Sequence, residues 1–304
     1  MTDIVVLMST YNGESFVKEQ LDSILLQKNV GVRVVVRDDG SSDRTEEIVR
    51  SIDDDRITFI RGKNLGCSRS FFELLRYAEA NYPDINYFAF ADQDDYWLDD
   101  KLETACQYLR NQPDEVPCLY ISNLYVTDEY LQEPTLLYPT EISLDKMHSL
   151  VENHATGCTM VFNREVVHRI LKTNTDRYRI HDIPIFRLCL FSGNVHFDMK
   201  PHIYYRQHRQ NVIGANYYAR QRINSKLKSL SKFTKQHIKE NDALICLEEL
   251  KPYLSQEDIA LFETVAFYRS NLKYRLTLLF SKRCRLRRPV DNFWFKVRVV
   301  LGCI

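Results

Sequence analysis

The chain has 304 residues, of which 44% are hydrophobic and 27% charged, a composition typical of a globular protein with a substantial core and not of a disordered chain. Its formal net charge is zero, but residues 219–304 carry 18 Lys and Arg against 8 Asp and Glu, whereas residues 1–218 carry 23 against 33. This asymmetry argues against one uniform domain and predicts a basic region that meets something anionic. The sequence contains no run of about 18 uncharged apolar residues, which argues against a transmembrane helix.

The N-terminal residues favour a cytoplasmic chain. Asp3 stands where a signal peptide needs a basic residue, and strand-like apolar residues follow at once. The eight cysteines are scattered without a C-x-x-C pair, so reduced thiols are favoured over disulfides and over metal binding by these cysteines.

The first hundred residues alternate between strand-like and helix-like hydrophobic patterns. Strands are predicted at 3–10, 32–36, 57–62 and 86–90, and helices at 15–28, 43–52 and 71–80. Asp43 and Glu46 have the spacing of a capping box at the start of the second helix. The alternation predicts an α/β fold with a doubly wound, parallel sheet.

The loops after the four predicted strands should converge on one edge of the sheet, where ligands of open α/β sheets bind. The fourth strand leads directly into three carboxylates, Asp92, Asp94 and Asp95. Such a cluster suits a nucleotide whose diphosphate is bridged by Mg²⁺ or Mn²⁺, because both ions prefer oxygen ligands. The sequence has neither G-x-G-x-x-G after its first strand nor a P-loop, so a dinucleotide site and a P-loop site are not indicated.

Several ordered motifs resemble the family 2 nucleotide-sugar glycosyltransferases of the GT-A fold. The motifs are VVLMSTYNGESFVKEQLDSILLQ at 5–27, VVVRDDGSSDRT at 34–45, NLGCSRSF at 64–71 and FADQDDYWLDDK at 90–101. DQDDYW, with HATGCTMVFNR, HD and YRQHRQNVIG further along, is similar to the rhamnosyltransferase-like bacterial branch. The resemblance implies a Rossmann-like, mostly parallel sheet with helices on both faces.

The resemblance covers roughly residues 3–215 and therefore predicts the domain organisation. We expect a GT-A catalytic domain at 1–218, with a donor half at about 1–100 and an acceptor half at about 101–218. A basic helical region is expected at 219–304.

The resemblance also implies roles for individual residues on the donor side. Thr10, Tyr11 and Glu14 match positions that frame the base and ribose, and Asp39 matches the carboxylate that hydrogen-bonds the pyrimidine. Asp92 matches the residue that meets the ribose or a metal-bound water.

Three further positions are expected to carry the metal and the chemistry. Asp94 and His208 match residues suited to hold Mn²⁺ or Mg²⁺ beside the diphosphate, and Asp182 matches the catalytic carboxylate. The resemblance thus implies one base that deprotonates the acceptor hydroxyl and inversion at the anomeric carbon. A retaining double displacement would need a second carboxylate, for which the sequence offers no separate candidate.

Each of these residues also has a structural interpretation. Asp39 could be a turn residue, because Asp is favoured in turns and at helix caps. Trp97 could stack on a sugar or simply pack, His181 could contact a sugar or pack, and His208 could be structural. His154 could line the acceptor side.

The C-terminal residues predict helices. Ser255 and Asp258 have capping-box spacing, and Phe293, Trp294 and Phe295 follow a basic run. We expect either a bundle packed on the catalytic domain or, as favoured here, peripheral attachment to the inner face of the cell membrane. A nucleic-acid partner is not indicated, because no recognised binding module accompanies the basic residues.

The sequence therefore predicts a metal-dependent, inverting glycosyltransferase. Its expected donor is a dTDP or UDP sugar, with rhamnose as the first candidate, and its acceptor is a growing bacterial surface polysaccharide or a lipid-linked glycan. A nucleotidyltransferase and a non-catalytic nucleotide-sugar-binding subunit of a polysaccharide synthase are the alternatives. The first should carry a Gly-rich basic loop that STYNGESF lacks, and the second should lack the carboxylate at position 182.

Overall fold

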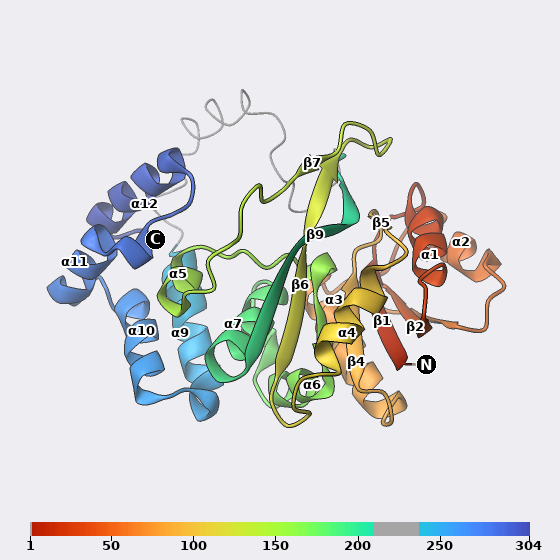
Figure 1. The fold of residues 1–304 in the computed structure, drawn as a ribbon, viewed down its shortest axis with the longest axis horizontal. Coiled ribbons are helices and arrows are strands. Elements are labelled where there is room, and N and C mark those ends of the chain that lie inside the picture. The colour runs from red at the N-terminus through yellow and green to blue at the C-terminus, as the bar shows by residue number, and fades with distance from the viewer. Residues whose placement is uncertain (1, 209–236) are drawn as a thin grey trace. The chain divides into compact units, whose positions relative to one another are not determined.

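The computed structural model describes residues 2–208 and 237–304, which fall into two compact units (Figure 1). One unit comprises Met1–Ile142 and Ala155–Gly214, and the other comprises Ser143–His154 and Ala215–Ile304. The predicted boundary at residue 218 lies outside the described residues. The segment Ser143–His154, expected in the acceptor half, groups instead with the C-terminal helices.

The first four strands form the parallel half of one mixed sheet. In the order β3-β2-β1-β4, they are β3 (Ile57–Arg61), β2 (Val30–Asp38), β1 (Thr2–Thr10) and β4 (Tyr87–Ala91). The apolar residues from Ile4 to Met8 are completely buried, as expected for a central parallel strand that is covered on both faces. The predicted strands of residues 1–100 are confirmed, and their carboxyl ends share one edge.

Helices connect these parallel strands. They are α1 (Val17–Leu25), α2 (Thr45–Ser51) and α3 (Cys67–Asn81). The predicted capping box of Asp43 and Glu46 is wrong, because α2 begins at Thr45. Asp43 instead accepts hydrogen bonds from the backbone N–H groups of Glu14 (3.0 Å) and Thr45 (3.0 Å), so it joins the loops after β1 and β2.

The other half of the sheet is mixed in direction. β8 (Val161–Asn163) runs antiparallel to β4, and the sheet continues through β6 (Cys118–Thr127), β9 (Asn194–Arg206) and β5 (Tyr96–Trp97), with β7 (Thr135–Leu136) on β6. Its helices are α4 (Lys101–Leu109), α6 (Arg164–Leu171) and α7 (Asp182–Ser192). The sheet is thus parallel for the four strands predicted in the donor half and mixed beyond them, where β5 also pairs antiparallel with β9.

The second unit is helical in the residues that the structure describes. Its helices are α5 (Lys146–Val151), α9 (Ile238–Leu250), α10 (Gln256–Ala266), α11 (Leu272–Phe280) and α12 (Pro289–Leu301). α10 packs on α5, α9 and α11, and it buries Phe262 and Val265 completely. The Ser255 hydroxyl accepts the Asp258 N–H at 3.1 Å, which confirms the predicted cap of α10. Within residues 2–208 and 237–304, no helix has the length and apolar character required to cross a bilayer.

Candidate active site

The acidic loop lies where the sequence predicts it, directly after the central strand β4. Asp92 is half-buried and Asp95 is completely buried. Burial, followed by the negative charges of Asp94 and Asp182, raises the pKa of Asp92 to about 7. Burial also raises the pKa of Asp95 well above its usual range. The loop thus gathers three carboxyl groups, two of them with strongly raised pKa values, a feature typical of functional sites.

His208 and Asp94, which are 114 residues apart in the chain, meet at this loop. The Nε2 atom of His208 lies 2.7 Å from the Oδ2 atom of Asp94, and both side chains are largely buried. The imidazole also packs on the Phe16 ring, with 4.9 Å between ring centroids. The structure therefore brings together the two side chains predicted to hold a metal.

Arg206, at the end of β9, fixes this arrangement. Its buried guanidinium donates to the backbone carbonyl of Asp94 (2.9 Å) and to the carboxylate of Glu19 (2.6 Å), and it lies over the Phe16 ring. Because His208 follows two residues later, these contacts determine where its imidazole is presented. Arg206 lies inside the quoted motif YRQHRQNVIG but was not predicted as a site residue.

Asp182, the predicted base, is the first residue of α7 and is largely buried. It is close enough to Asp92 to contribute to the raised pKa of that carboxyl. A helix N-terminus stabilises an ionised carboxylate through its free N–H groups and the helix dipole. The predicted base and the acidic loop therefore belong to one site.

His181 precedes Asp182 and packs in the core. Its ring stacks on Phe71 at 4.0 Å between centroids and meets the edge of Phe90. Burial lowers its pKa to about 3, and among the described residues neither ring nitrogen has a hydrogen-bond partner. A Cβ atom at Gly157 would lie only 2.7 Å from the His181 Nε2 atom, so the glycine makes room for this ring. The geometry favours packing over a sugar contact.

The loops after β1 and β2 are joined by hydrogen bonds that involve the predicted nucleotide-binding residues. The Thr10 hydroxyl is buried and donates to Asp38 at 3.2 Å. Glu14 is exposed, and its carboxylate accepts the Arg44 N–H at 3.0 Å. The Tyr11 side chain is half exposed, so its ring is accessible to a ligand. The predicted contacts of all three residues with a nucleotide stay predictions.

Asp39 is held by three donors. Arg37 Nη1 lies 2.5 Å from Asp39 Oδ1, the Leu65 N–H donates to the same oxygen, and the Gly66 N–H donates to Oδ2, both at 2.8 Å. A carboxylate has about four acceptor positions, so one position on Oδ2 is left for a further donor such as a pyrimidine N–H. Its predicted contact with a pyrimidine stays a prediction, as does its interpretation as a turn residue.

The predicted contact of Trp97 with a sugar is wrong. Its side chain is only 1% exposed, and the Nζ atom of Lys101 lies 3.8 Å from the ring centroid. Burial lowers the pKa of this lysine to about 7. A ring that is covered in this way cannot form a stacking wall for a sugar, and packing is its role here.

His154 lies in the second unit, where its Nε2 atom is 3.0 Å from that of His148. Its predicted place on the acceptor side stays a prediction.

Besides Arg206, the sequence reasoning missed two residues of the site. Gln93 accepts the Tyr11 N–H at 2.8 Å and donates to the Tyr11 carbonyl at 3.1 Å, so it ties the acidic loop to the loop after β1. Of the eight free cysteines, Cys67 is the one that is exposed. Partial burial of its thiol, together with the negative charges of nearby carboxylates (Asp92, Asp182, Asp39 and Asp94), raises its pKa to about 12. The positions of Gln93 and Cys67 inside the quoted motifs were the available signal.

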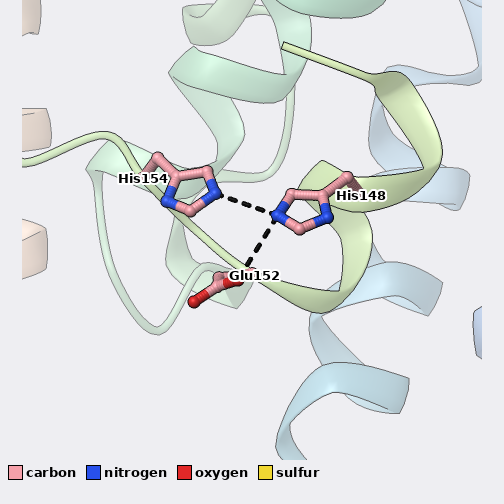
Figure 2. A group of neighbouring side chains, drawn as sticks. All are labelled: His148, Glu152 and His154. Atoms are coloured by element: carbon pink, nitrogen blue, oxygen red, sulfur yellow. Dashed lines mark hydrogen bonds and ion pairs between the residues drawn. The ribbon is translucent and has the colours of Figure 1, made fainter. Parts of the chain in front are cut away.

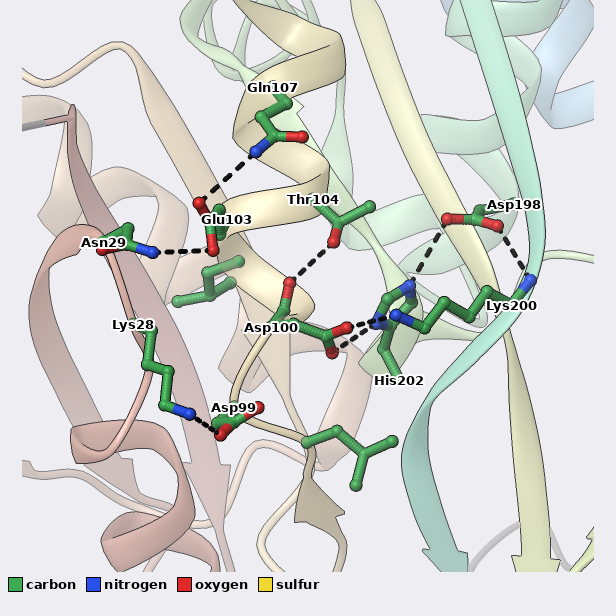
Figure 3. Close-up of polar contacts among 12 residues, drawn as sticks. Lys28, Asn29, Asp99, Asp100, Glu103, Thr104, Gln107, Asp198, Lys200 and His202 are labelled. Atoms are coloured by element: carbon green, nitrogen blue, oxygen red, sulfur yellow. Dashed lines mark hydrogen bonds and ion pairs between the residues drawn. The ribbon is translucent and has the colours of Figure 1, made fainter.

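A polar network around the buried His202 secures the chain that leaves the acidic loop (Figure 3). Asp100 precedes α4, but its carboxylate does not cap the helix; it pairs with Lys200 at 2.5 Å and His202 at 2.7 Å. His202 is completely buried, and its other nitrogen faces Asp198 at 3.3 Å. Burial acts to raise the pKa of Asp100, but these hydrogen bonds and charges outweigh it and lower the pKa. The network fixes β9 beside the acidic loop.

Comparisons with known proteins agree with this geometry. The family model described as "Glycosyl transferase family 2" matches residues 5–171, more than half of the chain. The chain is 29% identical to the dTDP-rhamnosyl transferase RfbG of Shigella flexneri over 229 residues, which cover 69% of this chain and 74% of the relative. It is 24% identical to the UDP-Glc:alpha-D-GlcNAc-diphosphoundecaprenol beta-1,3-glucosyltransferase WfaP of Escherichia coli over 246 residues, which cover 80% of this chain and 90% of the relative.

Among solved structures, S. aureus TarS 1-349 in complex with UDP-GlcNAc is similar in fold, with a TM-score of 0.57 at 14% identity over 98% of this chain and 79% of that chain. Together with the match of the family model and the α/β sheet described above, this likeness confirms the predicted fold. The chain therefore belongs to glycosyl transferase family 2 and is a glycosyltransferase of the GT-A fold.

Proposed function

We propose that the protein transfers a sugar, with inversion, from a nucleoside diphosphate sugar to a hydroxyl group of a bacterial surface polysaccharide or lipid-linked glycan. The observation that carries this proposal is the grouping of Asp92, Asp94, His208 and Asp182 at the carboxyl edge of the parallel strands. Ligands of open α/β sheets bind at that edge.

The side chains at the acidic loop offer ligand atoms that suit a divalent cation, Mn²⁺ or Mg²⁺. Asp94 and His208 would hold it, because their ligand atoms Oδ2 and Nε2 are only 2.7 Å apart. The pKa of Asp92 is raised first by burial and then by the charges of Asp94 and Asp182, and a nearby cation would offset those two charges. Such an ion supplies Lewis-acid stabilisation of the negative charge on a departing diphosphate.

Other side chains of the protein bind the nucleotide and deprotonate the acceptor. Tyr11 presents an accessible ring to the base, and Asp39 accepts a pyrimidine N–H with its remaining acceptor position. Asp182 takes the proton of the acceptor hydroxyl as that oxygen attacks the anomeric carbon. Because one carboxylate acts as base and none acts as nucleophile, the configuration inverts.

The names of two relatives narrow the choice of donor sugar and of acceptor. RfbG is named a dTDP-rhamnosyl transferase, which favours dTDP-rhamnose as the first donor to test. WfaP is named for a glucose donor and a diphosphoundecaprenol-linked acceptor, which favours a lipid-linked acceptor here and keeps UDP-glucose as a second donor.

The second unit supports attachment to an anionic membrane surface. Leu272, Leu276 and Phe280 recur every four residues along α11 and are 69%, 44% and 78% exposed, so they share one apolar face. On α12, Phe293 is 61% exposed, whereas Phe295 is only 3% exposed, so the predicted interfacial position is wrong for Phe295. Exposed arginines between the two helices, Arg283, Arg285, Arg287 and Arg288, provide the positive charge that anionic headgroups attract.

Calorimetric titration with nucleotides tests the donor site. We expect dTDP or UDP sugars to bind in the presence of Mn²⁺ and to lose most of their affinity in EDTA, with the tightest sugar identifying the donor. The Asp94→Ala variant should bind the same compound more weakly, with only partial recovery at excess Mn²⁺. If no nucleoside diphosphate bound with or without metal, the proposed function would be wrong.

Vesicle sedimentation tests the membrane surface. We expect binding to vesicles of phosphatidylglycerol and weaker binding to vesicles of phosphatidylcholine. The Leu272→Ser/Phe280→Ser variant should bind phosphatidylglycerol at least tenfold more weakly, because each buried side chain contributes about 1.5 kcal/mol or more. Leu26→Ser is the matched control, since Leu26 is 66% exposed in the first unit. Equal binding by all three proteins would exclude the α11 face.

A further inference from the structure

Two histidines and a glutamate form a compact group in the second unit (Figure 2). The Nε2 atom of His148 lies 3.0 Å from the Nε2 atom of His154 and 3.3 Å from a carboxylate oxygen of Glu152. One ligand atom from each of the three residues lies within 4.8 Å of the other two. His148 and His154 are only 8% and 5% exposed, so the group is not a set of solvated surface side chains.

Local structure fixes all three residues. α5 is capped by Asp145, whose carboxylate accepts the His148 N–H at 2.9 Å, and Glu152 follows one turn after His148. Residues four apart on a helix share a face, so the Glu152 carboxylate comes to lie beside the imidazole. The Arg287 N–H donates to Glu152 at 2.8 Å and holds that carboxylate from the C-terminal part of the unit. His154 completes the group from the extended chain after α5.

The spacing is close to that of a tetrahedral zinc site. Zn–N bonds of about 2.0–2.1 Å and tetrahedral angles place two ligand atoms roughly 3.3 Å apart. The two distances from the His148 Nε2 atom, 3.0 Å and 3.3 Å, lie within a few tenths of an ångström of this value. Two nitrogen ligands and one carboxylate oxygen also favour zinc over Mg²⁺, because Mg²⁺ prefers oxygen ligands.

We propose that His148, Glu152 and His154 form a binding site for Zn²⁺ or a similar borderline divalent cation, separate from the proposed metal site at Asp94 and His208. Three protein ligands leave the fourth tetrahedral position for water. A bound ion would fix the segment Ser143–His154 locally, because all three ligands come from its residues 148–154.

The experiment uses the full chain with the Asp94→Asn substitution, which removes the carboxylate of the other proposed metal site. After treatment with a chelator, the protein is titrated with ZnCl₂ in a competition calorimetry experiment, and Co²⁺ is added separately to record its visible absorption. We expect one tightly bound Zn²⁺ and the strong visible bands of four-coordinate Co²⁺. No nucleotide is involved, so the outcome is independent of the proposed transfer reaction.

Conservative variants locate the ion. His148→Gln, Glu152→Gln and His154→Gln should each weaken Zn²⁺ binding at least tenfold, since even loss of an outer-shell partner costs about 10–100-fold. His168→Gln is the matched control, because His168 also pairs with a glutamate, Glu79 at 2.9 Å, and should change the affinity less than twofold. If the folded Asp94→Asn chain bound no Zn²⁺, or if all three variants kept their affinity, the proposal would be wrong. His148 and His154 would then be only a hydrogen-bonded pair.

Discussion

The raised pKa of Asp92 predicts that Mn²⁺ binding depends on pH in a range where ordinary carboxylates do not titrate. In the metal-free protein, burial and the charges of Asp94 and Asp182 raise this pKa to about 7. A cation prefers the ionised carboxylate and must displace the proton when one is bound. Affinity is therefore full above pH 7 and decreases as the pH falls below 7.

The size of the effect follows from the pKa. At pH 6 about nine-tenths of the Asp92 carboxyl groups are protonated, and at pH 8 about one-tenth are. Through this carboxyl alone, the apparent Kd for Mn²⁺ should therefore be up to about tenfold higher at pH 6 than at pH 8, with release of up to about 0.9 proton per ion at the lower pH. With an ordinary Asp pKa of about 3.9, Asp92 would stay ionised over this range and would contribute no pH dependence.

Calorimetry with Mn²⁺ alone measures both quantities, because a diphosphate would titrate in the same range. Pairs of buffers with different ionisation enthalpies give the number of protons released. The Asp92→Asn variant should lose the part of the pH dependence that comes from this carboxyl, and the His208→Gln variant should bind Mn²⁺ more weakly but keep that part, which separates the carboxyl from the imidazole. A wild-type Kd that is constant between pH 6 and pH 8 would refute the reasoning.

Three further predictions concern chemistry and packing. Asp182→Asn should reduce turnover at least a hundredfold and leave the Kd for the donor nucleotide nearly unchanged, as measured by steady-state assay and calorimetry; undiminished turnover would remove the base assignment. Gly157→Ala should lower the free energy of unfolding by about 1–3 kcal/mol in urea, since its Cβ would lie 2.7 Å from the His181 Nε2 atom and the stacked ring has little room to move. Arg37→Met should cost about 3–5 kcal/mol in the same experiment and weaken nucleotide binding, because it leaves the buried Asp39 carboxylate without its cation; a loss below 1 kcal/mol would contradict this.

Local sequence patterns determined much of the fold. The strands and helices of the first hundred residues follow hydrophobic periods and turn residues that act over a few positions, so they could be read without tertiary information. The cap of α10 by Ser255 is equally local. The same local rule gave the wrong result for Asp43, because the loop after β1 offers its carboxylate a backbone N–H that no helix rule anticipates.

The composition of the site was also contained in the sequence, through the acidic loop after the fourth strand and the ordered motifs. Only the tertiary structure decided which of these groups meet. Asp94 and His208 are 114 residues apart, and their contact depends on how β9 packs beside the acidic loop. Packing likewise buried Trp97 under Lys101 and placed His148 against His154. Such contacts depend on long-range packing, which hydrophobic period and residue spacing do not specify.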